Sequence, residues 1–388
     1  MGNRVSRRDV LRQSAIGVSA VALSGASSAR AFAVNDQVQL GWIGCGGRSS
    51  GLMQHMMDNA KNFRVAGVCD LIPERMEKAK RFWSSHKPNG YLNFHEMFEK
   101  EKLDGVMAVV QVCKHAEVIV PVLEAGYHTF GEKPIDKDVE SIDALTIAAR
   151  KAWKEKGTFF QIGTQRRYHP TYQACMKAIH EGILGKITFM QGGWHWSSNP
   201  AQIPTDCDGG RLIEQASHHT DVMSWAMKNT APETCVAMAS NLEGRSPEFS
   251  ETHSSTTFQW ADGTMFSYTH LWCLPGRYDE EILTVFGEKG AVDLNQGKYY
   301  GRDEKTKDLG EASGKAWDRG SPEELVDFVE NIRTGGKRLP NANIETGRIC
   351  SLMCVMGRMA MVNAKKNAYE PRVIHWKDLG SKTDLPSA

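Results

Sequence analysis

The sequence has no excess of charge of either sign. Its 388 residues include 47 Lys and Arg against 46 Asp and Glu, a formal net charge of +1. No long run of like charge follows the N-terminal segment, which argues against nucleic acid or an anionic membrane as a partner. We therefore expect a globular protein that acts on a small molecule, long enough to form two domains with sizeable cores.

Long hydrophobic runs, internal repeats and low-complexity tracts are also missing. No segment after the N-terminus has the about 20 predominantly apolar residues that a membrane-spanning helix needs. The chain contains no C-x-x-C pair, and its nine cysteines are scattered and odd in number. Cys350 and Cys354 share one face of an expected helix, which holds them poorly for bridging. We expect the cysteines to be buried free thiols.

Residues 1–33 differ in composition from the rest of the chain. The pair Arg7 and Arg8 precedes an Ala/Ser/Gly-rich apolar run at Ser14–Ser28, and small residues at Ala29–Ala33 fit a cleavage site. This order resembles a twin-arginine export signal, which is read by a receptor and carries folded proteins. We expect a periplasmic or otherwise exported protein, with no membrane contact after signal cleavage. An amphipathic helix or a disordered basic tail is the alternative.

After this segment, short apolar runs alternate with helical patterns. The expected strands are 38–44, 63–70, 104–112 and 127–134, and the expected helices are 50–60, 72–83 and 116–126. Strands and helices that alternate at this spacing are typical of a doubly wound parallel sheet, the Rossmann arrangement. The fold class is therefore α/β.

The second half of the chain has a different pattern. After a helix at 170–181, longer alternating segments joined by Asp-Gly and Glu-Lys-Gly turns predict a large, mostly antiparallel open sheet in an α+β domain. Residues 298–320 are polar and Gly-rich, so we expect a loop there. Two helices, at 322–336 and 343–366, end the pattern, and the methionines of the second are expected to pack in the core.

These patterns divide the chain into four parts. Residues 1–33 form the signal, 34–157 the dinucleotide-binding domain and 158–338 the substrate-binding domain. Residues 339–388 form a C-terminal helix and tail that we expect to pack back on the first domain.

A glycine-rich loop lies where the first strand turns into the first helix. In Gly44-x-Gly46-x-x-Ser49, the glycines let a pyrophosphate approach the N–H groups of the helix N-terminus. Asp70 ends the second strand, where a carboxylate can bind ribose hydroxyls and repel a 2'-phosphate, so the sequence favours NAD over NADP. Asp70 can also cap the next helix. The residues expected to bind the cofactor are Gly44, Gly46, Gly47, Arg48, Ser49, Asp70, Glu132 and Lys133.

Two further motifs carry a family resemblance. "AEVIVPVLEAGYHTFGEKP" contains the triplet E-K-P at Glu132–Pro134, and "GGRLIEQASHHTDVMSW" follows in the second half. In this order, with the glycine loop and "IGTQRRYHP", they are similar to the Gfo/Idh/MocA family, which is named partly after glucose-fructose oxidoreductase and inositol dehydrogenase. The resemblance covers essentially everything after the signal.

The resemblance implies roles for three residues. Lys133 matches the lysine that contacts substrate and nicotinamide, and His218 matches the catalytic histidine. Glu214 stands where the family usually has aspartate, and its carboxylate reaches one methylene further. We expect Lys133, His218 and Glu214 to be catalytic. Oxidising an alcohol requires a base for the hydroxyl proton, which an imidazole supplies, while the lysine stabilises the alkoxide.

The match is incomplete after the third strand. Val110 and Gln111 stand where the family usually has Thr-Pro, although His115 still matches the histidine that follows.

Substrate contacts are expected around the same site. Aromatic faces suit the C–H surfaces of sugars, and the face shared by Glu214 and His218 continues along the helix. The residues expected to bind substrate are Arg167, Trp194, His195 and Asp221.

The sequence thus predicts an exported oxidoreductase that transfers hydride between a tightly bound NAD(P) and a sugar or polyol, and that forms homo-oligomers. The alternative is an NAD-dependent glycosidase that oxidises its sugar transiently, so that its substrate is a glycoside. Two further hypotheses are a metal enzyme with His195, Glu214, His218 and Asp221 as ligands, and a non-catalytic sugar-binding protein. We expect no metal.

Overall fold

A computed structural model describes residues 37–197, 207, 209–240, 251–312, 319–365 and 368–383. The expected export signal lies outside these residues. No helix in the described part of the chain is long and apolar enough to cross a membrane.

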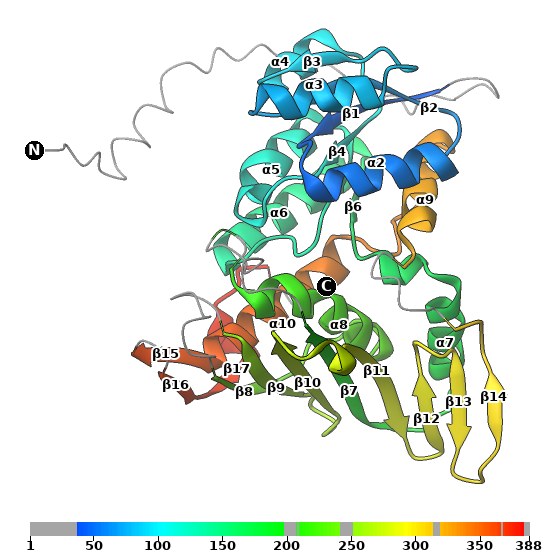
Figure 1. Cartoon of the computed structure of the whole chain (residues 1–388), viewed down its shortest axis with the longest axis vertical. Helices are drawn as coiled ribbons and strands as arrows, with labels where there is room; N and C mark the ends of the chain where they lie inside the picture. Colours follow the sequence, from blue (N-terminus) through cyan, green and yellow to red (C-terminus); the bar gives the residue numbers. More distant parts are fainter. Residues whose placement is uncertain are drawn as a thin grey trace, which may run out of the picture.

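Figure 1 shows two sheets at opposite ends of the molecule with helices between them. The first sheet has six parallel strands in the order β3-β2-β1-β4-β5-β6. Its elements are β1 (Val38–Ile43), α2 (Gly47–Asn59), β2 (Phe63–Cys69), α3 (Pro73–Phe82), β3 (Asn89–Tyr91), α4 (Phe94–Lys100), β4 (Gly105–Ala108), η1 (Val112–Lys114), α5 (His115–Ala125), β5 (His128–Gly131), α6 (Val139–Lys156) and β6 (Phe160–Ile162). This confirms the doubly wound arrangement.

Local sequence explains where these elements begin and end. β1 is apolar almost throughout because helices cover both faces of a parallel sheet. The Asp138 side chain accepts from the backbone N–H of Ser141 at 2.9 Å and so caps α6. The same helix ends at Gly157, whose φ of +66° is easily reached only by glycine.

The second sheet has nine strands in the order β14-β13-β12-β11-β7-β10-β9-β8-β17. All its neighbours are antiparallel except β7 and β10, which confirms a mostly antiparallel sheet. Its strands are β7 (Ile187–Trp196), β8 (Thr234–Ser240), β9 (His253–Gln259), β10 (Met265–Trp272), β11 (Glu280–Gly287), β12 (Gly290–Asp293), β13 (Lys298–Gly301), β14 (Thr306–Asp308) and β17 (Val373–His375). The other elements are η2 (Gln165–Tyr168), α7 (Pro170–His180), α8 (Arg211–Ala226), η5 (Gly276–Tyr278), α9 (Ser321–Arg333), α10 (Ile344–Ala360), β15 (Met361–Lys365), β16 (Ala368–Pro371) and η6 (Trp376–Leu379).

Two C-terminal helices connect the sheets. α10 packs against α8 of the second domain and α6 of the first, and its Met353 and Met356 are fully buried, as expected for core methionines. α9 packs against α2 and β1, and Leu325 and Phe328 join the core of the first domain. Each such large apolar side chain stabilises the fold by about 1.5–3 kcal/mol when buried.

The structure differs from the expected boundaries in several places. The helix expected at 343–366 ends at Ala360, and the C-terminal tail, expected to pack back on the first domain, adds β17 to the second sheet. β6 pairs with β5, so the first sheet extends beyond residue 157. α9 also packs with the first domain, although its residues were expected in the second. The polar segment 298–320, expected to be a loop, contains the hairpin β13–β14. β13 pairs with both β12 and β14, and the exposed strand β14 forms the edge of the second sheet.

Candidate functional site

The loop after β1 requires glycine at its first position. Gly44 has a φ of +85°, and a Cβ at this position would lie 2.1 Å from the carbonyl oxygen of Val109. Gly46 precedes α2, and no atom lies within 4 Å of an added Cβ at either Gly46 or Gly47. The helix therefore begins beside open space, with its first N–H groups lacking intrahelical acceptors.

Asp70 is tied to this loop. Its two carboxylate oxygens accept from the backbone N–H groups of Cys45 at 2.7 Å and Ile72 at 2.9 Å. Asp70 therefore joins β2 to the glycine loop, and it also orders the turn that leads into α3. Each oxygen keeps lone-pair capacity for a ribose hydroxyl.

Ser49 and Arg48 point in different directions. Ser49 is buried, and its Oγ accepts from the indole N–H of Trp42 at 2.7 Å. Its side chain therefore packs the helix on the sheet and is not available to a cofactor. Arg48 donates to Glu132 at 2.6 Å, and its Nη2 lies 4.0 Å from Glu324.

Glu324 is a residue that the sequence did not single out. It lies in the first turn of α9, it is fully buried, and neither carboxylate oxygen has a hydrogen-bond partner among the described residues. Burial raises the pKa of Glu324 well above 4.5, and the charge of Glu132 raises it further. No local pattern marks this residue, because α9 reaches the site only through tertiary packing.

Lys133 and Glu214 meet between the two domains. The Lys133 ammonium donates to the backbone oxygen of Glu214 at 2.7 Å and lies 3.5 Å from its Oε1. Lys133 follows β5, and Glu214 lies in the first turn of α8. The structure therefore brings together two of the three residues expected to be catalytic, from segments 81 residues apart.

His218 lies one turn further along α8. Its ring stacks on Trp194 of β7 with centroids 5.5 Å apart, and only 8% of the residue is exposed. Burial lowers the pKa of His218 well below 6.5, and the positive charges of Lys133 and Arg166 lower it further. The imidazole is therefore neutral at neutral pH. This places His218, Trp194 and Lys133 in one neighbourhood.

The structure corrects the roles expected for Arg167 and Asp221. Both are buried, and the Arg167 guanidinium donates to the two Asp221 oxygens at 2.8 and 2.9 Å and to Asn229 at 2.9 Å. They therefore hold η2 against α8 and do not face a substrate. The preceding Arg166 lies near the site instead, with its Cζ 5.7 Å from the Trp194 ring centre. Neighbouring side chains in a 3-10 helix point about 120° apart, which separates the two arginines.

His195 is also placed differently from the expectation. Successive side chains of a strand point to opposite faces, so His195 lies on the face of the sheet away from Trp194 and α8. Its Nε2 lies 2.8 Å from the Thr269 hydroxyl, and its Nδ1 lies 3.9 Å from Glu280. His195 and His218 therefore lie on opposite sides of the second sheet. The set of four metal ligands considered above is therefore not assembled, and the described residues contain no cluster able to hold a metal ion.

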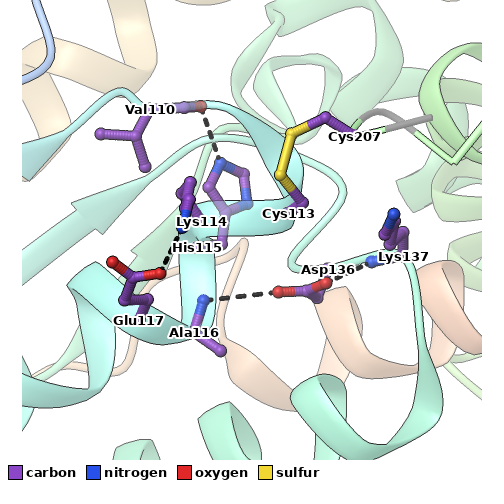
Figure 2. Close-up of a disulfide and its surroundings, with 9 residues drawn as sticks. All are labelled: Val110, Cys113, Lys114, His115, Ala116, Glu117, Asp136, Lys137 and Cys207. Carbon is purple, nitrogen blue, oxygen red and sulfur yellow. Dashed lines mark hydrogen bonds and ion pairs between the residues drawn. A yellow bond between two sulfur atoms is a disulfide. The ribbon is translucent and has the colours of Figure 1, made fainter. Parts of the chain in front are cut away.

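A disulfide joins the domains beside this site. Cys113 of η1 is bonded to Cys207, 94 residues away, with Cα atoms 5.0 Å apart (Figure 2). The expectation that all the cysteines are free was therefore wrong for this pair. Sequence spacing could not reveal it, because only domain packing brings the two residues together. The remaining seven are free, including Cys350 and Cys354.

The first domain fits a bound dinucleotide. Open space at Gly46 and Gly47 faces the N-terminus of a 13-residue helix, whose first turn has no acidic residue. A pyrophosphate suits that position because the helix dipole is positive there. A six-stranded parallel sheet in the order 3-2-1-4-5-6 with this loop defines a dinucleotide-binding domain, here joined to an α+β domain.

Comparison with known proteins identifies the family. Residues 38–158 match the description "Oxidoreductase family, NAD-binding Rossmann fold", and residues 172–293 match "GFO/IDH/MocA C-terminal domain". Together the matches span more than half of the chain. The protein belongs to the Gfo/Idh/MocA family of oxidoreductases, and its first domain is the NAD-binding fold of that family.

Several relatives are inositol dehydrogenases. Inositol 2-dehydrogenase/D-chiro-inositol 3-dehydrogenase from Lactiplantibacillus plantarum is 26% identical over 49% of this chain and 53% of its own length. The chain thus matches only about half of that relative. Myo-inositol 2-dehydrogenase from Thermotoga maritima is 22% identical over 77% of this chain and 88% of its own.

The fold is shared with a solved relative. The crystal structure of scyllo-inositol dehydrogenase from Lactobacillus casei with bound NAD(H) and scyllo-inositol has a TM-score of 0.70 and 17% identity. The match covers 88% of this chain and all of that one.

Proposed function

We propose that this protein is an NAD-dependent oxidoreductase that oxidises a secondary hydroxyl group of a polyol or sugar. The observation that carries the proposal is the contact of Lys133 with Glu214 beside the carboxyl end of β5, with His218 one turn further along α8. Ligands of open parallel sheets bind outside the carboxyl ends of their strands, so the nicotinamide end of a dinucleotide belongs here.

The chain's own residues supply acid–base chemistry and charge. Neutral His218 can accept the proton of the hydroxyl group, and the Lys133 ammonium can stabilise the negative charge that develops on the same oxygen. The Glu214 carboxylate, 29% exposed, can accept from a neighbouring hydroxyl and so orient the ring. Bound NAD⁺ supplies a hydride acceptor.

Arg166 and Trp194 extend this site toward the substrate. Arg166 forms an ion pair with Glu281, yet its Nε and Nη1 are buried and have no acceptor within the described residues. Buried donors without acceptors are rare, and a hydroxyl or carboxylate oxygen of the substrate, or an ordered water, would satisfy them. Trp194 offers a ring for the C–H face of a polyol.

Asp70 favours NAD over NADP in this proposal. Its carboxylate stands at the end of β2, where the adenosine ribose belongs, and would repel a 2'-phosphate. The relatives named above are dehydrogenases, which favours net oxidation over the glycosidase alternative.

We also propose that the protein is exported. Arg7 and Arg8 within the N-terminal pattern support this, and so does the Cys113–Cys207 disulfide, because disulfides persist in oxidising compartments. Since free nicotinamide cofactor is scarce there, the protein would fold around NAD before export and retain it. Replacing both arginines with lysine should block export, whereas export of that variant would contradict the twin-arginine assignment.

Homo-oligomers fit the open face of the second sheet. Val236, Met238, Met265 and Val373 expose 38% to 62% of their surface there. A second copy could cover these apolar side chains. Light scattering of the purified protein should give a multiple of the monomer mass, and a monomer at micromolar concentration would exclude this proposal.

One experiment tests the activity. Protein purified from the exported fraction is denatured and the released nucleotide is identified by mass spectrometry, and NAD is expected. Intact protein is then mixed with inositols, other polyols and sugars while the absorbance of reduced nicotinamide is followed. His218→Ala should retain NAD and slow reduction by roughly 10²- to 10⁴-fold. Reduction by no compound of the panel, or equal rates in the variant, would overturn the proposal.

A further inference from the structure

The Cys113–Cys207 disulfide belongs to a closed path of contacts that passes through Lys133. The Lys133 ammonium donates to the backbone oxygen of Glu214 at 2.7 Å, and the backbone N–H of Glu214 donates to the carbonyl of Gly210 at 3.1 Å. Gly210 stands three residues after Cys207. This half of the path runs from the lysine through the first turn of α8 to the disulfide.

The other half runs through the first domain. His115 stands two residues after Cys113, and its ring nitrogens lie 2.8 Å from the carbonyl oxygen of Pro134 and 3.1 Å from that of Val110. Figure 2 shows the His115 ring directed toward the Val110 carbonyl, with the disulfide beside it. Pro134 directly follows Lys133, so this second half of the path connects the disulfide to the same lysine.

The first-domain side of this path is held firmly. Asp136 is buried, and its carboxylate accepts from the backbone N–H of Lys137 at 2.7 Å and from that of Ala116 in the first turn of α5 at 3.4 Å. The segment after E-K-P is thus fastened to the same helix that carries His115. Cys113 therefore lies in a segment that these hydrogen bonds hold in place.

On the second-domain side, the first turn of α8 is held within its own domain, where Glu251 Oε1 accepts from the backbone N–H of Leu212 at 3.1 Å. The segment between Cys207 and this turn contains Gly209 and Gly210, with φ values of +75° and +89°. Glycines lose the most conformational freedom on ordering, so this pair by itself holds the turn only weakly against the first domain. A Cβ on Gly209 would lie 2.9 Å from Cβ of Lys137, so the segment already runs close against the first domain. The disulfide adds a covalent bond at that contact.

We propose that Cys113 and Cys207 are positioning residues, whose disulfide holds the Lys133 ammonium against the first turn of α8 and thereby in line with His218. The purpose of this alignment rests on the proposed function. Both cysteines are partly exposed, so a dithiol can reach them. In the reduction, the S–S bond breaks, the dithiol gives up two electrons and two protons, two thiols form, and the dithiol becomes a cyclic disulfide.

The test compares the double variant Cys113→Ser/Cys207→Ser with wild type and with Cys273→Ser, which removes a free thiol of the second domain. Trace labelling with acetic anhydride, followed by peptide mass spectrometry, measures the reactivity of Lys133 relative to Lys154 on the exposed face of α6. Loss of a hydrogen bond to a charged group should raise the relative labelling of Lys133 by about tenfold or more. Cys273→Ser should leave it unchanged.

Catalysis provides the second readout. Since a displacement of about 1 Å can cost 10²-fold, kcat/KM of the double variant should fall by about 10- to 100-fold while bound NAD stays at the wild-type level. In a Lys133→Met background, loss of the disulfide should cause no further decrease, because both changes act on one group. If the disulfide had only a structural role, its loss would lower kcat/KM by the same factor with Lys133 present and in the Lys133→Met background.

If the double variant does not fold, wild-type protein treated with dithiothreitol supplies the form without the Cys113–Cys207 bond. Reoxidation with oxidised glutathione should then restore the low labelling of Lys133. Unchanged Lys133 labelling, or an equal increase at Lys133 and Lys154, would overturn the inference. Increased labelling at Lys133 in a protein whose NAD no polyol reduces would overturn the proposed function and leave the positioning role standing.

Discussion

The glycine loop of the first domain and the α8 region of the second build their sites in different ways. The loop uses backbone groups of one continuous stretch between β1 and α2, and the distant Asp70 carboxylate accepts from one of them. The α8 region uses side chains from η2, β7, α8 and β11, brought together across the sheet. A site made of contiguous backbone can be recognised in sequence, whereas a site of converging side chains depends on the direction in which each one points.

The largest expected effect is on the buried pair behind the α8 site. Arg167→Met leaves the Asp221 carboxylate buried without its partner, so the free energy of unfolding should fall by about 3–5 kcal/mol. Arg150→Met removes an exposed pair with Glu345, and it should cost about 0–1 kcal/mol. Urea unfolding followed by circular dichroism measures both. Equal small losses would show that Arg167 is not structural, and would bring it back as a substrate contact.

The next largest effect is expected on the rate of hydride transfer when Lys133 is replaced. Lys133→Met removes the charge expected to stabilise the developing alkoxide, so reduction of bound NAD by an active polyol should slow about 10²- to 10³-fold. Lys114→Met, an exposed change in the neighbouring η1, is the control. Rapid-mixing absorbance at the reduced nicotinamide band gives the rates. The same loss in both variants would mean that the decrease is not specific to Lys133.

Two glycine substitutions in the loop of the first domain distinguish an effect on stability from an effect on NAD binding. Gly44→Ala places a Cβ against the Val109 carbonyl at a positive φ, so it should destabilise the protein by about 1–3 kcal/mol. Gly47→Ala meets no protein atom within 4 Å, so it should leave stability unchanged or slightly higher while lowering NAD content. Thermal unfolding and released nucleotide are measured on both. Full NAD content in Gly47→Ala would place the pyrophosphate elsewhere.

A smaller effect concerns pH. Burial lowers the pKa of His270 well below 6.5 and that of His128 to about 4. As pH falls below about 6.5, the unfolded chain takes up protons that the folded protein does not, so stability falls progressively toward pH 4. His270→Gln should reduce the loss between pH 7 and pH 5 by about 1–2 kcal/mol, and the exposed His95→Gln should not. Identical pH profiles of unfolding would contradict a buried neutral His270.

The smallest effect is expected for His195. Because it lies on the sheet face away from α8, His195→Gln should change kcat/KM less than about threefold, within the range of changes made away from a site. Trp194→Leu, one residue earlier and on the α8 face, should raise KM clearly. Steady-state kinetics with one active polyol compare the two. A larger effect of His195→Gln would mean that substrate reaches the outer face of the sheet.

The sequence identified much of the first region because its signals are local. The glycines of the loop, Asp70 at a strand end and the alternating strands and helices all follow from short-range constraints on the backbone. The family resemblance also selected Lys133, Glu214 and His218, which the structure brings into one neighbourhood.

Tertiary structure alone decided the rest. The choice between Arg166 and Arg167 depends on how η2 lies against α8, and the face taken by His195 depends on the register of β7 within the second sheet. Glu324 and the Cys113–Cys207 bond join segments far apart in the chain. Local sequence determines which backbone conformations a segment favours. Which side chains come into contact is decided by how distant segments pack, and this packing depends on the whole chain.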